Sequence, residues 1–531
     1  MTPRVEARPP ASAIIDPETD PAIVARYLED AAHYPGGHAV AVLRPRSIDE
    51  LSACLRSNAS TLVVGAQSSL TGGATPAGDV VIATERLDDI AIARDRIRVG
   101  AGVPLQTVQD MLAEHGRWLP PVPTYLGAFA GGAVATCAAG AATFKYGTVR
   151  NWVDGVTVVL AGGDVLELNR GDHHASSTGT FEIETSTGTR VIQLPSLTMP
   201  DVPKSSAGYF IKPGMDLIDL FIGSEGTLGV IAGVTFRTAP LPAGLCRAFV
   251  PVASEQQGIT LAGALREAAI ATWRSGEPNG IDIASIEHID ARSIQVVRED
   301  GVDRRLEISL PAGTGIALLV DIELPLSVAK QDHWRAIESA LDGDAQDSPL
   351  VRFCCLLAAH GCLDDAEIAL PADRSRAAAF AELREAVPAG VNRRVAQAKQ
   401  RDAGISKTAA DMIVPYDRFG EMMTVCRRLF SERDLDLAVW GHISDGNVHP
   451  NVVPRTASDV VKGREAILEL GTAVIAMGGS PLAEHGVGRN PIKQELLRQL
   501  YGSAGVDAMR AIKLGLDPNG SLASGVIFPT Q

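Results

Sequence analysis

Two histidines near the end of the chain have a spacing that would let them bind one metal ion. They lie in the segment WGHISDGNVHPN, where the Asp-Gly pair at 445–446 is a favoured tip for a two-residue β-hairpin turn. Counting back from this tip pairs Ile443 with Val448 and His442 with His449. Residues paired in this way have Cβ atoms about 5 Å apart on one face of the hairpin. The segment therefore predicts two imidazole ligands for a single ion.

A second polar segment, AEHGVG, places a carboxylate beside another histidine in a turn bounded by glycine. Together, His442, His449 and Glu484 form a set that suits Zn²⁺, Mn²⁺ or Fe²⁺ and leaves a coordination position open for substrate oxygens. For either segment alone, histidines in an ordinary turn are the simpler interpretation. The occurrence of both segments in one chain favours the metal site.

Three segments rich in glycine and small residues come earlier in the chain. The segment at 63–73, VVGAQSSLTGG, follows a run of strand type and lets backbone N–H groups converge on an anion such as a pyrophosphate. It matches neither GxGxxG nor GxxxxGK[ST], so a nicotinamide Rossmann site or a P-loop kinase is poorly supported, and a plain glycine-rich turn is the alternative. The tract at 127–142 implies close approach of a ligand to its backbone, or tight packing of a helix on a sheet. The third segment is IGSEGTLGVI at 222–231.

Alternating apolar runs and helical patterns must position these segments. AVAVLRP, SIDELSACLRSN and TLVVG predict a β-α-β unit, with Ser47 and Glu50 as a capping box at the start of its helix. A second helix is predicted over 104–116, with Gly116 as its C-cap. Antiparallel hairpins are predicted with turns at 162–163 and 187–188.

The composition indicates a large globular protein with more than one core. At 531 residues, with 46% apolar and 21% charged residues, the chain should form at least two cores and three structural units. Residues 240 to about 435 mix strands such as GIALLVDIEL with Ala-, Glu- and Arg-rich helices, which predicts a separate α+β unit. A net charge of −15 makes nucleic acid an unfavourable partner, so an anionic substrate needs a local positive site.

Cysteine usage and hydropathy indicate the compartment. The seven cysteines are sparse and include no CxxC pair, so we expect a reducing environment and no iron–sulfur cluster. The first 37 residues lack the apolar core of a signal peptide, and no run of about 18 apolar residues occurs. We therefore expect a soluble cytoplasmic protein, with peripheral attachment to the inner face of the membrane left open.

Four motifs make the chain resemble a known family: VVGAQSSLTGG, GGAVATCAAGAATFKYG, VPKSSAGY and DLFIGSEGTLGVI. They are similar to those of FAD-linked D-2-hydroxy acid dehydrogenases, a branch of the vanillyl-alcohol oxidase and p-cresol methylhydroxylase (PCMH) flavoproteins, and the resemblance spans nearly the whole chain. It implies an α+β fold in three parts. These are a two-subdomain FAD-binding domain of PCMH type at 1–239 with an N-terminal extension at 1–38, a substrate domain with an antiparallel sheet at 240–475, and a segment at 476–531 that returns to the FAD domain.

The resemblance also implies roles for the three small-residue segments. The first would bind the FAD diphosphate, the second would lie along the isoalloxazine and ribityl region, and the third near the adenine side. The residues implied are Gly65, Ala66, Gln67, Ser68, Ser69, Leu70, Thr71, Gly72, Gly73, Gly131, Gly132, Ala135, Thr136, Ala139, Gly140, Tyr146, Gly147, Glu225, Gly226 and Val230. The diphosphate loop contains neither histidine nor cysteine, so we expect noncovalent FAD, and His115 is more simply a histidine at a helix end.

The chain departs from the family pattern at a few of these positions. Cys137 stands where asparagine is common, and Ala128-Phe129 replaces a Thr-Ile pair. Near the C-terminus, Ala523-Ser524 replaces Asn-Pro in a segment that resembles LDPxGxLNPGK. Any contact that the asparagine side chain makes with the cofactor is therefore absent here.

The C-terminal motifs resemble GHxxDGNxH and EHGxG of the same family. This resemblance implies that His442, His449 and Glu484 are the metal ligands. It also makes His485 the general base that takes the 2-hydroxyl proton while hydride passes to flavin N5. The ion would polarise the substrate hydroxyl and supply the local positive charge.

Three further residues are implied to bind the substrate. Arg384, in an LRE segment, would hold a carboxylate bidentately, as its planar guanidinium allows. Lys407 precedes the D-x-x-VP strand of the family, and Asn451 follows the second histidine. The alternatives are a solvated helix charge for Arg384 and a surface lysine for Lys407.

The sequence therefore predicts an FAD-dependent, metal-assisted oxidation of a small D-2-hydroxy acid to a 2-oxo acid. The chain offers no second redox centre, so electrons would pass to a separate acceptor such as a quinone, a cytochrome or an electron-transfer flavoprotein. An alcohol or aldose oxidase of the same fold that uses oxygen is the alternative, and a flavoprotein without turnover is a third hypothesis. The acid, the metal and any homodimer are left open.

Overall fold

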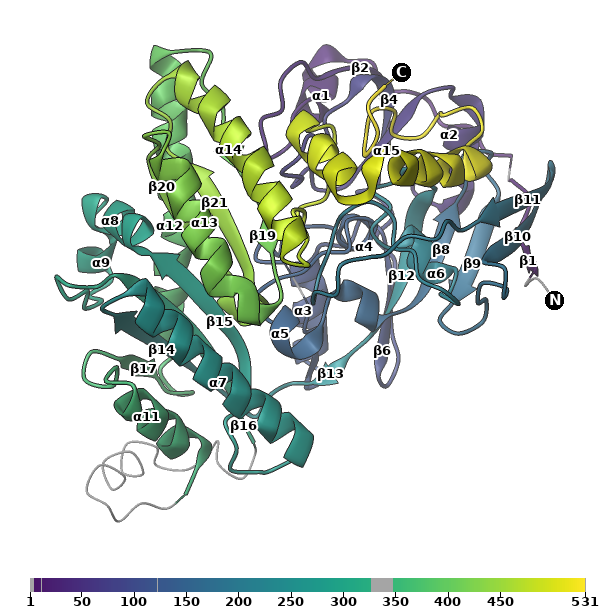
Figure 1. Cartoon of the computed structure of the whole chain (residues 1–531). Helices are drawn as coiled ribbons and strands as arrows, with labels where there is room; N and C mark the ends of the chain where they lie inside the picture. The colour runs from purple at the N-terminus through teal and green to yellow at the C-terminus, as the bar shows by residue number, and fades with distance from the viewer. Residues whose placement is uncertain (1–3, 11, 122, 326–346, 531) are drawn as a thin grey trace. The chain divides into compact units, whose positions relative to one another are not determined.

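The computed structural model describes residues 4–10, 12–121, 123–325 and 347–530. The chain divides into two compact units (Figure 1). Unit 1 comprises residues 1–140, 147–240 and 480–531, and unit 2 comprises residues 141–146 and 241–479. The short segment 141–146 thus leaves unit 1 in the middle of its sequence and packs within unit 2.

Unit 1 begins with the predicted β-α-β arrangement. Strands β2 (His38–Leu43) and β3 (Thr61–Val64) both pair in parallel with β4 (Ala77–Ala83), and helix α2 (Ile48–Ser57) connects β2 to β3. Leu51 and Leu55 recur at helical spacing on α2 and are buried in one cluster with Ile82 of β4. This confirms the prediction.

The other sheets of unit 1 are antiparallel apart from the pairing of its first strand. A five-stranded sheet has the order β5-β6-β12-β8-β9, a three-stranded sheet has the order β1-β10-β11, and β7 pairs with β13. The strands are β1 (Arg4–Glu6), β5 (Ile90–Ile92), β6 (Arg96–Gly100), β7 (Arg117–Trp118), β8 (Val153–Val159), β9 (Val165–Asn169), β10 (Thr180–Thr185), β11 (Gly188–Gln193), β12 (Val230–Arg237) and β13 (Ala239–Pro240). The helices are α1 (Pro21–Val24), η1 (Ala25–Tyr27), α3 (Leu105–Ala113), α4 (Ala130–Ala135), η2 (Val149–Trp152), α6 (Ile218–Phe221) and α15 (Pro491–Leu516).

The structure differs from the predicted elements in three local details. Ser47 caps α2 by accepting from the Glu50 N–H at 3.2 Å, but the Glu50 carboxylate accepts from the N–H of Arg46 rather than that of Ser47. The β10–β11 turn is at 186–187, one residue before the predicted position, because Thr185 pairs with Gly188.

The predicted end of α3 also shifts. The helix ends at Ala113, and Gly116 follows in a further turn with φ of +66°. His115 behaves as a helix-end histidine, since its Nδ1 lies 2.9 Å from the carbonyl oxygen of Met111. The β8–β9 hairpin forms with Gly162 and Gly163 in its turn, as predicted.

Unit 2 is built on one large sheet with the order β17-β14-β16-β15-β20-β21-β18, and β19 also pairs with β21. The strands are β14 (Gly244–Val252), β15 (Ile283–Asp290), β16 (Ile316–Leu324), β17 (Glu367–Ala369), β18 (Thr408–Ala409), β19 (Met412–Ile413), β20 (Leu437–Gly441) and β21 (Asn447–Val452). The helices are α5 (Thr143–Tyr146), α7 (Glu255–Ser275), α8 (Ala291–Glu299), α9 (Val302–Arg305), α11 (Pro349–Ala359), α12 (Arg374–Arg401), η3 (Tyr416–Arg418), α13 (Phe419–Ser431), η4 (Ile443–Asp445) and α14 (Ala457–Ala476). The pairings of this sheet are antiparallel.

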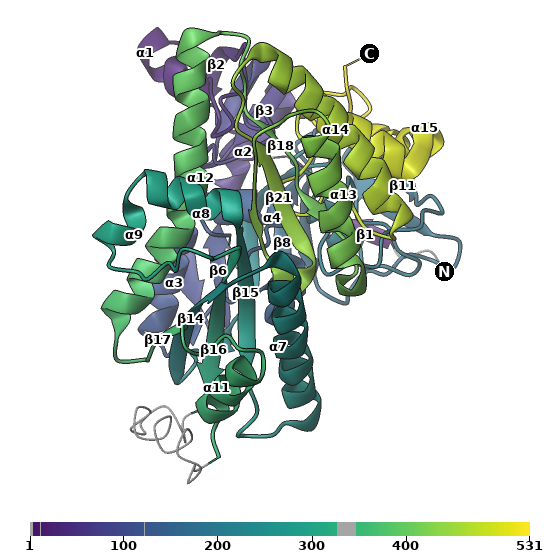
Figure 2. The same ribbon diagram turned by 60° about the vertical axis from the view of Figure 1, so that its left-hand side comes forward.

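Alternation along β16 assigns helices to the two faces of this sheet. Leu319 is buried in one cluster with Phe380 and Leu383 of α12. Ile316 points to the opposite face, where a Cβ on Gly258 of α7 would lie only 2.0 Å from its Cδ1. Figure 2 shows α12 and α7 on opposite sides of the sheet. Helix α12 therefore carries Arg384 along one face, beside β15.

Two positions where the family commonly has asparagine adopt the left-handed backbone conformation. Cys137 has φ of +49° and Ala523 has φ of +45°. Asparagine visits this region more readily than most residues, because its short polar side chain can hydrogen-bond locally. The family asparagines thus suit the backbone, and this chain keeps the conformation with less suitable residues.

We predict that Ala523→Gly raises the stability of unit 1. A left-handed residue with a Cβ costs about 1–2 kcal/mol, part of which is offset by the larger unfolded entropy of glycine, so we expect a gain of up to about 1 kcal/mol. Ala271→Gly, at an exposed position inside α7, should instead lower stability by about 1 kcal/mol. Calorimetric Tm values measure both changes, and a lower Tm for Ala523→Gly would contradict the assignment of strain.

Candidate functional site

The turn between β20 and β21 differs from the predicted two-residue hairpin. Trp440, rather than His442, pairs with His449, so the predicted pairing of His442 with His449 and of Ile443 with Val448 is wrong. The reason is that η4 occupies the turn and Gly446 alone takes positive φ, at +82°, whereas a type I′ turn needs positive φ at both central residues. His442 therefore lies beyond the end of β20.

The two imidazoles nevertheless lie close together within unit 2. Their ring centroids are 5.4 Å apart and their planes are nearly perpendicular, at 86°. His442 is 2% exposed and His449 is 5% exposed. Gly441 permits this chain path, because a Cβ there would lie 2.7 Å from the backbone of Asn447 and Val448. The prediction that these two rings could bind one ion is therefore compatible with the fold, although the rings are brought together by a different turn from the one predicted.

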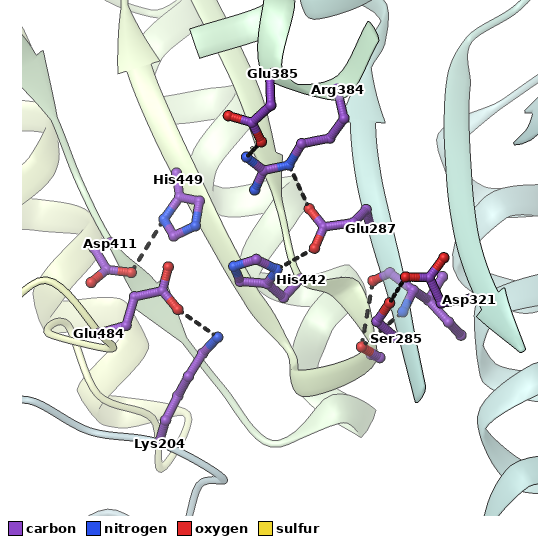
Figure 3. A network of polar contacts seen from close by, with 12 residues as sticks. Lys204, Ser285, Glu287, Asp321, Arg384, Glu385, Asp411, His442, His449 and Glu484 are labelled. Atoms are coloured by element: carbon purple, nitrogen blue, oxygen red, sulfur yellow. Dashed lines mark hydrogen bonds and ion pairs between the residues drawn. The ribbon is translucent and has the colours of Figure 1, made fainter. Parts of the chain in front are cut away.

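Each of these histidines has a carboxylate behind its Nδ1 (Figure 3). The Nδ1 of His442 lies 2.5 Å from Oε1 of Glu287, and the Nδ1 of His449 lies 3.3 Å from Oδ1 of Asp411. The side-chain amide of Asn447 donates to the same Asp411 oxygen at 3.1 Å. A carboxylate that accepts from one ring nitrogen, as Glu287 does from His442, fixes the tautomer and leaves the other nitrogen able to bind a ligand. Buried pairs of this kind suit a metal-binding role.

The predicted substrate residue Arg384 joins this network. Its Nε donates to Oε2 of Glu287 at 2.8 Å, and its Nη1 donates to Glu385 at 2.9 Å. Burial alone would raise the pKa of the Glu287 carboxyl, but Arg384 and His442 outweigh burial and hold that pKa well below its usual range. Glu287 is thus an anion shared between a guanidinium and an imidazole.

The other two predicted substrate residues have different surroundings in unit 2. Lys407 is exposed and comes immediately before β18. Asn451 on β21 is 2% exposed, and its amide donates to the carbonyl oxygen of His449 at 2.9 Å. Within the described ranges, the buried Oδ1 of Asn451 has no hydrogen-bond partner, which is a reason to expect a ligand there.

In unit 1, the segment 484–488 is held by side chains from two of the quoted motifs. Lys204 of VPKSSAGY lies 2.8 Å from the Glu484 carboxylate, with 1% of its side chain exposed. Ser206 accepts from the Gly486 N–H at 3.0 Å. Nε2 of His485 lies 3.5 Å from the neighbouring Glu484 carboxylate. The predicted base and the third predicted ligand therefore lie in a turn that side chains of unit 1 hold by hydrogen bonds.

Glu225 holds the same turn from the third small-residue segment. Its carboxylate accepts from the N–H groups of Val487 and Gly488, at 2.7 and 2.8 Å. Burial raises the pKa of the Glu225 carboxyl, and the two N–H groups partly oppose that shift. Glu225 is predicted to contact the cofactor, but its carboxylate hydrogen-bonds the protein backbone.

The predicted cofactor segments converge within unit 1. The N–H of Glu225 donates to the Ala135 carbonyl at 2.8 Å, which joins the second segment to the third. The N–H of Arg489 donates to the Thr71 carbonyl at 3.0 Å, which joins the first loop to the turn at 484–488. In the first loop, the Ser69 hydroxyl accepts from the Gly73 N–H at 3.1 Å.

The second tract contains one glycine that packs tightly and one that faces open space. A Cβ on Gly131 would lie 2.5 Å from that of Ala101, so tight packing requires glycine there. A Cβ on Gly132 would meet nothing within 4 Å, so the backbone there faces open space, and its contact with a cofactor stays a prediction. Tyr146, in contrast, lies in unit 2, where its hydroxyl donates to Glu323.

Sequence reasoning gave no role to four residues of these networks. Glu287 is an ionisable residue inside the buried run IASIEHID, and a charge in such a run is itself a signal of function. Asp411, Lys204 and Ser206 occur in the quoted motifs D-x-x-VP and VPKSSAGY. The motifs marked these residues, but the sequence did not show what they contact.

We predict that Glu225→Ala loosens the turn at 484–488. Two buried N–H groups would lose their acceptor, at a cost of about 1–3 kcal/mol, so their exchange should quicken by roughly 10- to 100-fold. Hydrogen–deuterium exchange of peptides that cover 486–490 measures the change. Glu495→Ala, which removes an ion pair to Arg498 on α15, is the control. Unaltered exchange at Val487 and Gly488 would show that Glu225 does not hold the turn.

Comparison with known proteins places the chain among flavoproteins. Residues 260–527 match the C-terminal domain of FAD-linked oxidases, and residues 39–169 match an FAD-binding domain. A solved structure of alkyldihydroxyacetonephosphate synthase has a TM-score of 0.60 at 14% identity, and the match covers 96% of this chain and 81% of that one. These matches confirm the expected α+β fold with an FAD-binding domain of the PCMH type.

Curated relatives match over nearly the whole chain. A D-lactate dehydrogenase of Archaeoglobus fulgidus is 25% identical, over 98% of this chain and 97% of the relative. A D-2-hydroxyglutarate dehydrogenase of Xanthomonas citri is 25% identical, over 100% and 98%. The mitochondrial D-2-hydroxyglutarate dehydrogenase of Bos taurus is 27% identical, over 93% and 78%. Among the described helices, none has the length and apolar character to cross a membrane.

Proposed function

Because the chain belongs to the family of FAD-linked oxidases, we propose that it is an FAD-dependent dehydrogenase that oxidises a small D-2-hydroxy acid to a 2-oxo acid. The observation that carries this proposal is the pair of buried histidines in unit 2, each with a carboxylate behind it. Relatives named D-lactate and D-2-hydroxyglutarate dehydrogenase support the substrate class.

In this proposal, unit 1 binds FAD without a covalent link. The loop at 65–73 would hold the diphosphate, and the open backbone at Gly132 together with residues 225–230 would line the rest of the cofactor. The convergence of these segments supports this assignment. When bound, FAD supplies a two-electron acceptor for the hydride that leaves the 2-carbon.

We assign His442, His449 and Glu484 as ligands of a divalent ion. The donor set of two imidazoles and one carboxylate suits Zn²⁺, Mn²⁺ or Fe²⁺, and such an ion lowers the pKa of a bound hydroxyl. Glu287 and Asp411 orient the two imidazoles, and Lys204 and Ser206 hold the turn that carries Glu484. The ligands therefore have supporting partners in their own units.

The remaining side chains bind the substrate and move its proton. Arg384 offers N–H donors to the substrate carboxylate, Lys407 offers positive charge, and the buried Oδ1 of Asn451 offers an acceptor. His485 accepts the 2-hydroxyl proton as the α-hydrogen leaves as hydride. With FAD bound, the two electrons would be passed on to a separate acceptor, for which a quinone, a cytochrome or an electron-transfer flavoprotein is the proposed class.

Anaerobic mixing with a panel of D-2-hydroxy acids tests this function. We expect D-lactate, glycolate, D-malate or D-2-hydroxyglutarate to bleach the flavin absorbance, and the purified protein to contain about one divalent ion per chain. Chelation should abolish bleaching, and added Zn²⁺ or Mn²⁺ should restore it. Full turnover after chelation would refute the metal site, and bleaching only by alcohols or sugars would favour an oxidase of the same fold.

A second test concerns the substrate carboxylate. Arg384→Ala should raise KM for the hydroxy acid by about 100-fold, because a charge-assisted, bidentate contact in a partly buried site is lost. Arg305→Ala, which removes an exposed ion pair to Glu382 in the same unit, should leave KM unchanged. Steady-state kinetics with an artificial acceptor give both values, and an unchanged KM for Arg384→Ala would remove this residue from the site.

A further inference from the structure

Glu287 lies at the centre of unit 2 and contacts two residues of different proposed function. It stands on β15, the strand next to β20, and 7% of its side chain is exposed. One carboxylate oxygen contacts Nδ1 of His442, and the other accepts from Nε of Arg384. Figure 3 shows the carboxylate between the two side chains. All three residues belong to unit 2.

On the histidine side, Glu287 determines which nitrogen is available for a metal ion. A carboxylate accepts a hydrogen bond and cannot donate one when ionised, so Nδ1 of His442 must carry the proton. The lone pair then resides on Nε2, and the ring is fixed in orientation. In Figure 3 the second nitrogen of His442 faces away from Glu287. Nε2 is thus the nitrogen that a metal ion could use.

On the arginine side, Glu287 takes one edge of the guanidinium. The Nε–H of Arg384 is engaged by a buried carboxylate, while Nη1 contacts Glu385, whose side chain is 49% exposed. The Arg384 side chain itself is only 12% exposed, so solvent reaches this pair mainly from the Glu385 side. In the proposed function the terminal nitrogens of Arg384 would bind the substrate carboxylate bidentately. Glu287 fixes the plane of that guanidinium.

A second pair in the same sheet shows that this arrangement is not simply how the fold buries arginine. Asp321 on β16 binds Nε and Nη2 of Arg247 at 2.6 and 2.8 Å, and also accepts from Ser285 at 3.3 Å. Asp321 takes both arginine donors with its two oxygens. Glu287 gives only one oxygen to arginine and the other to an imidazole. Asp321 is therefore a suitable control for Glu287, because it is another carboxylate that binds an arginine in the same sheet.

We infer that Glu287 is a positioning residue that couples the metal ligand His442 to the carboxylate-binding residue Arg384. This inference rests on the proposed function, because it assigns Glu287 a task in that same site. One buried carboxylate sets the tautomer of His442 and the orientation of Arg384 at once. Displacement of either side chain is then transmitted to the other, and occupancy by metal and binding of substrate are linked.

The first experiment measures metal affinity in the flavin-loaded protein. Glu287→Gln retains the size of the side chain and loses its charge, and it should weaken Zn²⁺ binding by about 10- to 100-fold in competition with a chromogenic chelator. Asp411→Asn should weaken it similarly, because Asp411 stands behind His449. Asp321→Asn is the control and should leave the affinity unchanged. Where Glu287→Gln prevents folding, Glu287→Asp keeps the charge with a shorter reach and should give a smaller loss.

The second experiment measures the link to substrate. At saturating metal, Glu287→Gln should raise KM for the hydroxy acid about tenfold, because Arg384 loses a charge-assisted hydrogen bond. The effects of Glu287→Gln and Arg384→Lys on KM should be non-additive, as expected for residues in contact. Asp321→Asn should again match the wild type.

The outcomes separate this inference from the proposed function. Equal metal affinity and equal KM in the wild type and in Glu287→Gln would overturn the coupling while leaving the metal site intact. Strictly additive effects of Glu287→Gln and Arg384→Lys would also overturn it. A wild-type protein that binds no divalent ion and turns over fully would overturn the proposed metal site, and this inference with it.

Discussion

The cost of burying charge is the constraint on which both halves of the candidate site depend. An ionised carboxylate or ammonium inside a protein is strongly unfavourable unless an opposite charge and hydrogen bonds compensate it. Glu287 is compensated by Arg384 and His442, and Lys204 pairs with Glu484. These pairs lie within single units. The charged groups that the site requires are therefore held in place by the folding of each unit.

The same cost of burying charge explains why backbone N–H groups hydrogen-bond a carboxylate in unit 1. Glu225 is half-buried, and desolvation raises the pKa of its carboxyl, but its oxygens accept from two N–H groups of the turn at 484–488. That turn also contacts the loop at 65–73 through Thr71. A family motif that resembles a flavin-binding segment thus also orders the segment that carries Glu484. The geometry of one proposed site depends on residues of the other.

Local signals in the sequence predicted the elements well, and long-range contacts much less. The β-α-β unit and the hairpins follow from periodicity and turn residues, so errors there amount to a residue or two. The predicted pairing of His442 with His449 was wrong because an Asp-Gly pair is compatible with more than one kind of turn. Here the chain forms the 3-10 helix η4 instead of a two-residue hairpin turn. Spacing cannot reveal that Glu287, more than 150 positions earlier, meets His442. Only the run of buried residues around Glu287 marked it as unusual.

Charge also relates the substrate to the metal in the proposed mechanism. Arg384 is already neutralised by Glu287, so the pair brings no net positive charge to an anionic substrate in a chain of net charge −15. Its guanidinium then contributes geometry and hydrogen bonds more than attraction. In the proposed mechanism the attraction comes from Lys407 and from a divalent ion at the histidine pair. In this proposal Glu287 lowers the charge that Arg384 offers and orients the ligand that brings the ion, so binding of the acid would depend on the metal.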